Sequence, residues 1–172
     1  MLRSNLLCAL IAAAVVTIFT GVASATTYTC PSNEVITIGT IQSGSFINLC
    51  AIDGVYEVLK EGLDNGKSKL RMKYTIPNVP AGTQYLNFWG IRPANSEGDN
   101  FQFYYNTTGA DFGQLITGAI INKPFAPGGG LTVALGLTTT STTTITILLS
   151  DTNNSGPILD TVTLDAVRIE TR

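Results

Sequence analysis

The sequence of 172 residues contains no histidine, only three cysteines and few charges, with Asp, Glu, Lys and Arg together at 13%. Without histidine the chain holds no Ser-His-Asp or Cys-His catalytic arrangement and no histidine-ligated zinc or iron site. Nothing in the sequence places two carboxylates in a shared cleft, as glycoside hydrolysis requires. The sequence therefore favours a protein that is not an enzyme.

Basic residues are also scarce, ten against twelve acidic ones. The densest basic group consists of Lys67, Lys69, Arg71 and Lys73, and its spacing of two places these side chains on one face of a strand. Binding of a phosphate backbone needs larger clusters of Lys and Arg. We therefore expect no nucleic-acid partner and interpret the group as a solvated face or as an edge strand protected by charge.

The first 25 residues have the pattern of a secretory signal peptide. Arg3 precedes an apolar stretch at residues 6–19, and Ala23-Ser24-Ala25 provides the small residues of a cleavage site. A retained membrane anchor is the alternative, although the stretch is short for a span, which needs ~20 residues. We expect cleavage after Ala25, a secreted or cell-surface location, and no membrane span in the mature chain.

Cys30 and Cys50 are the cysteines that remain after cleavage, because Cys8 lies in the signal peptide. Two cysteines in an exported chain most simply form a disulfide, which here closes a loop of about twenty residues. Two buried free thiols are the alternative. Sequons at Asn106 and Asn153 predict glycosylation of an exposed protein.

Short β-strands separated by turn residues follow one another along the rest of the chain. Runs rich in β-branched and aromatic residues predict strands at residues 34–41, 56–60, 69–76, 85–92, 100–107, 115–122, 131–137, 142–149 and 162–170. Clusters of Gly, Pro, Asn and Asp separate them, and no helical periodicity of useful length follows the signal peptide.

This pattern is typical of an all-β protein, an antiparallel β-sandwich of the jelly-roll or galactose-binding-like kind. It predicts three parts along the chain. They are a signal peptide at 1–25, an extended N-terminal strand segment at 26–42 and the sandwich domain at 43–172.

A hairpin of the runs at 85–92 and 101–107 is the most specific structural prediction. Alternation along two paired strands puts one apolar face of each toward the core. The residues predicted to face the core are Leu86, Phe88, Phe101, Phe103 and Tyr105.

The opposite face of this hairpin predicts a binding site. It places the only tryptophan, Trp89, beside Tyr104, with Asn87, Gln102 and Arg92 as candidate hydrogen-bonding residues. An aromatic pair exposed on a sheet suits the stacking of a sugar ring or the contact of a protein partner. The alternative is that another part of the chain covers this face.

Three segments of the chain together resemble a known family. They are DGVYEV at residues 53–58, NSEGDNFQFYYNTTG at 95–109 and LSDTNNSGPILDTVTLDAVRIE at 149–170. They resemble the β-sandwich accessory modules of secreted and cell-surface bacterial and archaeal proteins, which are similar in build to carbohydrate-binding modules and galactose-binding-like domains. The resemblance covers residues 43–170 and implies attachment, carbohydrate contact or stabilisation of a parent protein.

The resemblance also implies a structural calcium ion, because related modules often join their first and last strands through Ca²⁺. The matching acids are Asp53, Glu57 and Asp165, and calcium accepts oxygen ligands from distant parts of a chain. The apolar alternation slips near Asp165, as at a β-bulge. Relatives often carry a second acid before the Asp-Gly pair, where this chain has Ala51-Ile52. The alternative is that these acids cap turns; beyond calcium, no cofactor is expected.

Two functions follow from these observations. The first is a non-catalytic secreted or cell-surface protein that binds a glycan or a cell-envelope component through the exposed aromatic face. The second is a structural subunit of an extracellular filament, pilus or surface layer. In that case the segment from Thr26 to Ile41 completes the sheet of another copy of the chain by strand addition.

Overall fold

The computed structural model describes residues 26–92, 100–122, 130–151 and 157–172. The predicted signal peptide and the sequon at Asn153 lie outside these residues. Among the described residues, no helix has the length and apolarity that a membrane span requires.

Strands make up nearly all of the regular structure in the described part of the chain. The elements are β1 (Thr27–Thr29), β2 (Asn33–Ile38), β3 (Thr40–Ser43), the 3-10 helix η1 (Phe46–Cys50), β4 (Glu57–Lys60), β5 (Gly62–Asp64), β6 (Lys67–Lys69), β7 (Arg71–Val79), β8 (Gly82–Ile91), β9 (Phe101–Asn106), β10 (Gln114–Ile121), β11 (Leu131–Thr139), β12 (Thr143–Asp151) and β13 (Thr161–Thr171).

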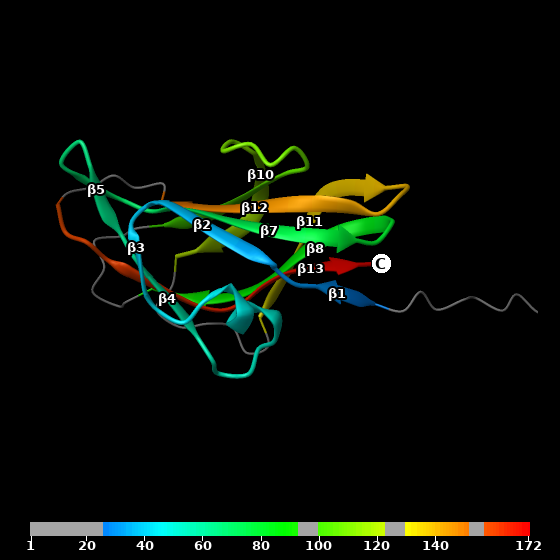
Figure 1. Ribbon diagram of the computed structural model, residues 1–172, viewed down its shortest axis with the longest axis horizontal. Coiled ribbons are helices and arrows are strands. Elements are labelled where there is room, and N and C mark those ends of the chain that lie inside the picture. Colours follow the sequence, from blue (N-terminus) through cyan, green and yellow to red (C-terminus); the bar gives the residue numbers. More distant parts are fainter. Residues whose placement is uncertain (1–25, 93–99, 123–129, 152–156) are drawn as a thin grey trace, which may run out of the picture.

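Two antiparallel sheets pack face to face (Figure 1). Sheet I has the order β11-β8-β13-β4-β3, with β1 also paired to β13, and sheet II has the order β10-β9-β12-β7-β2. β5 and β6 form a separate hairpin, and all these pairings are antiparallel. The predicted all-β, antiparallel β-sandwich is therefore confirmed.

The core lies between the inner faces of the two sheets. Phe88 of sheet I and Phe103 of sheet II meet there with ring centroids 4.8 Å apart. Leu86, Phe101 and Tyr105 are buried beside them, so all five predicted inward positions are confirmed. Burial of each large apolar side chain contributes about 1.5–3 kcal/mol, which makes this layer the main source of stability.

Each of the nine predicted runs overlaps a strand, but the run at 34–41 forms two strands in different sheets. Gly39 separates β2 from β3 with a φ of +107°, and a Cβ there would lie 2.5 Å from the Lys60 carbonyl oxygen. Glycine is therefore needed where the chain crosses from sheet II to sheet I. Alternation did not predict β1, β5 or β6, because strands of three residues are too short to display it.

The predicted hairpin of residues 85–92 and 101–107 is wrong. β8 lies in sheet I between β11 and β13, whereas β9 lies in sheet II between β10 and β12. Alternation fixes which side of a strand is apolar, but two strands that face each other across a core satisfy it as well as two paired strands do.

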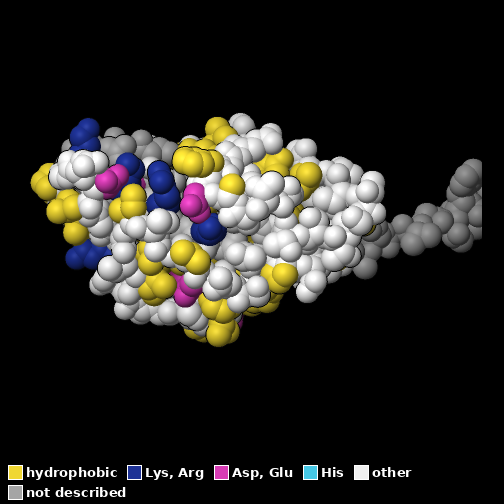
Figure 2. Space-filling view, turned by 45° about the horizontal axis from the view of Figure 1, so that its top comes forward, with side chains coloured by type: hydrophobic (Ala, Val, Ile, Leu, Met, Phe, Trp, Pro, Cys, Tyr) yellow, Lys and Arg dark blue, Asp and Glu magenta, His cyan; other side chains and the backbone are white. Residues whose placement is uncertain are grey.

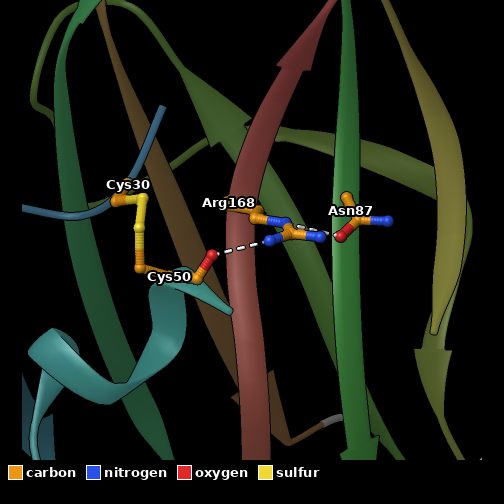
Figure 3. Close-up of a disulfide and its surroundings, with 4 residues drawn as sticks. All are labelled: Cys30, Cys50, Asn87 and Arg168. Atoms are coloured by element: carbon orange, nitrogen blue, oxygen red, sulfur yellow. Dashed lines mark hydrogen bonds between the residues drawn. A yellow bond between two sulfur atoms is a disulfide. The ribbon is translucent and has the colours of Figure 1, made fainter. Parts of the chain in front are cut away.

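The N-terminal strands pair within the chain's own sandwich. β1 pairs with the end of β13 in sheet I, and β2 pairs with β7 in sheet II. Between them, Cys30 forms the predicted disulfide with Cys50 of η1, with the two Cα atoms 5.1 Å apart (Figure 3). The strands of the segment at 26–42 thus belong to both sheets.

η1 packs against β13 where no described strand does. β4 pairs with residues 161–164 of β13 and β1 with residues 169–171, which leaves the residues between them without a strand on that side in the described part of the chain. η1 contacts β13, and Leu49 of η1 is fully buried within the core cluster. The helix thus closes the sandwich at a place where sheet I is incomplete.

Arg168 of β13 holds this N-terminal region on sheet I. Its guanidinium donates to the side-chain oxygen of Asn87 at 2.8 Å and to the carbonyl oxygen of Cys50 at 2.6 Å (Figure 3). It also lies 3.9 Å from the centre of the Tyr28 ring, a cation–π contact. One side chain therefore links β1, the disulfide segment and β8.

We expect replacement of both disulfide cysteines by serine (C30S/C50S) to lower the free energy of unfolding by about 3 kcal/mol, because the unfolded chain regains the entropy of an open loop. The sequence separation closed by the bond is 20 residues. Urea titrations followed by tryptophan fluorescence measure the change, and the wild-type chain under reducing conditions is the control. Equal stability of the oxidised protein and the double variant would contradict this expectation.

Candidate functional site

The outer face of sheet II carries a solvent-facing array of mixed side chains. One row across its five strands consists of Leu115, Tyr104, Leu148, Lys73 and Val35. The next row includes Gln102, Ser150 and Arg71. Figure 2, in which the top of Figure 1 comes forward, shows basic side chains beside acidic and hydrophobic ones on this side of the molecule.

A cleft of about 200 Å³ opens in this face. The described residues that line it are Arg71, Tyr104, Asp111, Phe112, Gly113, Leu148 and Ser150. β7, β9 and β12 contribute its floor, and the loop between β9 and β10 contributes a wall. Phe112 on that wall is 77% exposed, whereas Leu148 on the floor is buried. The cleft therefore combines aromatic surface with hydroxyl and charged groups.

The Asn106 side chain shapes the loop that forms the wall. Its Oδ1 accepts the backbone N–H groups of Thr108 at 3.1 Å and Gly109 at 2.8 Å. Its Nδ2 donates to the carbonyl oxygens of Ala110 at 2.9 Å and Phe112 at 2.8 Å. Asn106, predicted as a glycosylation site, thus uses its amide to hold the loop, and glycosylation there stays an untested prediction.

Acids pair with the lysines on either side of Arg71 but not with Arg71 itself. Lys73 and Asp111 lie 2.8 Å apart, and so do Lys69 and Asp64. In each pair the hydrogen bond from the lysine, followed by its charge, holds the pKa of the Asp carboxyl below its usual value. Arg71 forms no hydrogen bond or ion pair with the described residues, but its charge also contributes to the lowered pKa of both Asp carboxyls. A partly buried positive charge thus remains at the cleft.

The position of β7 corrects one interpretation of the basic group. β7 is an inner strand between β12 and β2, so the interpretation as a protected edge strand is wrong. The placement of all four residues on one strand is also wrong, since Lys67 and Lys69 lie on β6 and Arg71 and Lys73 on β7. The solvated-face interpretation holds for β7, because Arg71 and Lys73 alternate with the buried Met72 and Tyr74 on the outer side of sheet II.

The structure separates the residues that the sequence placed in one binding site. Tyr104 and Gln102 lie on the outer face of sheet II, as do the lining residues of the cleft. Trp89 and Asn87 lie on the outer face of sheet I, because β8 belongs to that sheet, and Arg92 follows the end of β8. The prediction that Trp89 lies beside Tyr104 is therefore wrong.

The outer face of sheet I is partly covered around Trp89. The ring of Tyr56 stacks on Trp89 with centroids 5.7 Å apart and planes inclined by 17°. Asn87 is buried, accepts from Arg168 and donates to the Thr132 hydroxyl at 2.9 Å. The alternative of a covered face thus holds at Asn87 and on one side of the Trp89 ring.

The three acids predicted to bind calcium do not converge. Asp165 lies at the predicted bulge of β13 and accepts the backbone N–H groups of Asp53 at 3.3 Å and Gly54 at 3.2 Å. The Asp53 carboxylate accepts the N–H of Val55 at 3.0 Å, and Glu57 points into the core. Within the described ranges, no three Asp, Glu or Cys side chains are grouped to hold a metal ion. Turn capping accounts for two of these acids, and calcium binding stays an untested prediction.

Glu57 is instead a buried carboxyl group next to the core. The Tyr74 hydroxyl donates to its Oε2 at 2.5 Å, and the Glu34 carboxyl, which accepts the Phe46 N–H at 2.9 Å, lies against it. Burial, followed by the hydrogen bond with Glu34, raises the pKa of Glu57 to about 9. Glu57 is therefore neutral at pH 7.

The sequence did not identify Arg71, Phe112 or Ser150 as site residues. Arg71 was interpreted only as part of a charged face, and Phe112 lies outside every predicted strand. A local signal for the loop was present, because Asn106 followed three residues later by Gly109 favours a turn closed by the Asn side chain. Its position over β12 depends on contacts distant in sequence. A Cβ on Gly113 would lie 2.8 Å from a Leu148 methyl carbon.

Known proteins offer similarity of fold only. No family model matches the sequence, and no curated protein matches it. A carbohydrate-binding module, TmCBM61, solved in complex with β-1,4-galactotriose, matches 81% of this chain and 88% of its own at 10% identity and a TM-score of 0.44. The K1 cleaved adhesin domain of Lys-gingipain from Porphyromonas gingivalis W83 matches 86% of this chain and 99% of its own at 15% identity, with a TM-score of 0.46.

A third structure belongs to an enzyme. The enzymatically active domain of tailspike protein 4 from bacteriophage CBA120 matches 85% of this chain but 19% of its own, at 15% identity and a TM-score of 0.42. The β-sandwich of this chain follows from its own strand pairings, and these structures are similar to it in general build. At these identities the likeness concerns the fold and carries neither ligand nor activity to this chain.

The buried carboxyl group makes stability depend on pH. The folded-state pKa of Glu57, about 9, lies above the unfolded value of 4.5, so raising the pH between these values removes a proton from the unfolded chain only. We expect the free energy of unfolding to fall across this window by up to about 1.4 kcal/mol per pH unit. Glu57→Gln, which cannot ionise and keeps an oxygen for Tyr74, removes this component.

Urea titrations of wild type and Glu57→Gln at several pH values between 5 and 9 measure the difference. Asp111→Asn is the control, because the lowered pKa of Asp111 keeps its carboxyl ionised over this whole range. Parallel pH profiles for wild type and Glu57→Gln would show that the Glu57 carboxyl is not protonated in the fold.

Proposed function

We propose that this protein is a non-catalytic, secreted or cell-surface glycan-binding protein whose ligand lies on the outer face of sheet II. The observation that carries this proposal is the cleft between β7, β9, β12 and the β9–β10 loop. Two aromatic side chains, Tyr104 and Phe112, line it together with the Ser150 hydroxyl and the Arg71 guanidinium.

This combination suits the two kinds of surface on a sugar ring. The C–H face of a pyranose packs on an aromatic ring, and its hydroxyl groups need hydrogen-bond donors and acceptors at the rim. Tyr104, Ser150 and Arg71 lie on three adjacent strands that hold them in fixed positions, which favours a preformed site. The cleft of about 200 Å³ is smaller than typical small-molecule pockets of ~300–1,000 Å³, so it accommodates one ring of a longer glycan.

The carboxyl groups support binding rather than hydrolysis of a glycan. Hydrolysis usually needs an acid and a base or nucleophile that flank the bond. Asp111 at the cleft is paired with Lys73, which lowers its pKa and so disfavours the protonated form. Glu57 has the raised pKa of a general acid, but it is fully buried and engaged by Tyr74.

A filament subunit is the less supported function. It requires residues 26–41 to leave this chain and complete a sheet in another copy. β1 and β2 are paired in the chain's own two sheets, and the Cys30–Cys50 disulfide ties the segment between them to η1. Strand addition would therefore break the pairings of β1, β2 and β3 within this sandwich, which favours a glycan over a second copy as the partner.

We expect Tyr104→Ala to weaken binding of a glycan identified on an array by about tenfold, because truncation of a central aromatic residue at an interface costs more than ~1 kcal/mol. Calorimetric titration with that glycan measures the dissociation constant. Tyr56→Ala is the matched control, since Tyr56 is an aromatic residue of the opposite face and is 43% exposed.

The control keeps wild-type affinity if the cleft on sheet II is the site. Loss of binding in Tyr56→Ala with full binding in Tyr104→Ala would move the site to the face around Trp89. If no glycan binds, and if the protein forms polymers that disappear when residues 26–41 are deleted, the function of a filament subunit replaces this proposal.

A further inference from the structure

We propose, building on the glycan-binding role above, that the cleft selects an acidic sugar and that Arg71 binds its carboxylate. The ligand class is a glycan that contains a uronic acid, a pyranose with a carboxylate on the ring. The charges on β6 and β7 and the position of Arg71 relative to the aromatic side chains support this assignment.

Arg71 has no ion pair of its own, although its charge also acts on the nearby Asp64 and Asp111 carboxyls. Lys69 is neutralised by Asp64 and Lys73 by Asp111, each with N–O distances of 2.8 Å. Arg71 lies between these lysines, forms no hydrogen bond or ion pair with the described residues, and lines the cleft. A ligand carboxylate would give Arg71 an ion pair of the kind that Lys69 and Lys73 already form.

The chemistry of the guanidinium favours a carboxylate. Its planar fork of N–H donors matches the two oxygens of a carboxylate and binds both at once, which is stronger than a hydrogen bond to a neutral hydroxyl. Partial burial also holds the side chain near the cleft and reduces the screening of its charge by water. A neutral sugar leaves this charge unpaired, so the cleft discriminates by charge as well as by shape.

The sheet places Arg71 at a suitable distance from the aromatic surface. Tyr104 on β9 and Arg71 on β7 are separated by β12 and lie in neighbouring rows, so two strand spacings of about 9.6 Å and a step of about 6.8 Å along the strand put their Cα atoms about 12 Å apart. Both side chains line the same cleft. A ring that packs on Tyr104 therefore directs a ring substituent across Leu148 and Ser150 toward the guanidinium.

The test uses uronic-acid trisaccharides and their methyl esters, which keep the backbone and remove only the negative charge. Trimers of galacturonate, glucuronate and mannuronate are titrated into wild type, Arg71→Gln and Lys67→Gln by calorimetry. Lys67→Gln is the matched control, because it removes one positive charge from an exposed position on β6 outside the cleft. We expect wild type to bind at least one trimer tenfold or more tightly than its ester.

Arg71→Gln loses that preference and binds acid and ester alike, whereas Lys67→Gln keeps it. Equal affinity of wild type for acid and ester, or an unchanged preference in Arg71→Gln, overturns the assignment. A sulfated trisaccharide bound more tightly than every uronate, with the same dependence on Arg71, also overturns the uronic-acid class.

The failure of this inference differs from the failure of the glycan-binding role. If wild type binds a neutral glycan in a way that Tyr104→Ala abolishes, and binds no uronate, the acidic class is wrong and the binding function stands. If no glycan of either kind binds, both are wrong.

Discussion

The contact between the Arg168 guanidinium and the Cys50 carbonyl, next to the Cys30–Cys50 disulfide, determines which face of the sandwich stays open. It holds η1 and β1 on sheet I, where Asn87 becomes buried and the Tyr56 ring stacks on Trp89. On sheet II the described loop between β9 and β10 lies beside a cleft. The proposed site therefore lies on sheet II because β1, η1 and the segment that carries Tyr56 lie against sheet I.

The carboxyl groups of Glu57 and Asp111 have different roles because their surroundings in the sandwich differ. Glu57 lies in the core, where burial keeps its carboxyl neutral and bound to Tyr74, so its role is structural. Asp111 lies on the surface, where Lys73 keeps it ionised and holds the wall of the cleft against β7. Arg71 differs from both, since it has no described protein partner and faces the cleft. The distribution of charge therefore points to recognition at the surface.

Patterns in the sequence were sufficient to predict those features of the fold that depend on residues close together in the chain. Alternation identified the inward faces of β8 and β9, its slip identified the bulge at Asp165, and the two cysteines identified the disulfide. Strand partners could not be predicted this way, because alternation is the same whether Trp89 and Tyr104 share a sheet or lie on opposite sides of the core. The cleft was missed for a related reason, since it exists only when the β9–β10 loop folds over β12.

The central claim is that a glycan binds on the outer face of sheet II, and backbone amide shifts in an NMR titration test it most directly. Addition of the glycan with the highest affinity on an array is expected to shift the signals of Arg71, Tyr104, Phe112 and Ser150 and to leave those of Asn87 and Trp89 unchanged. Shifts confined to residues around Trp89, with sheet II unaffected, would contradict the account.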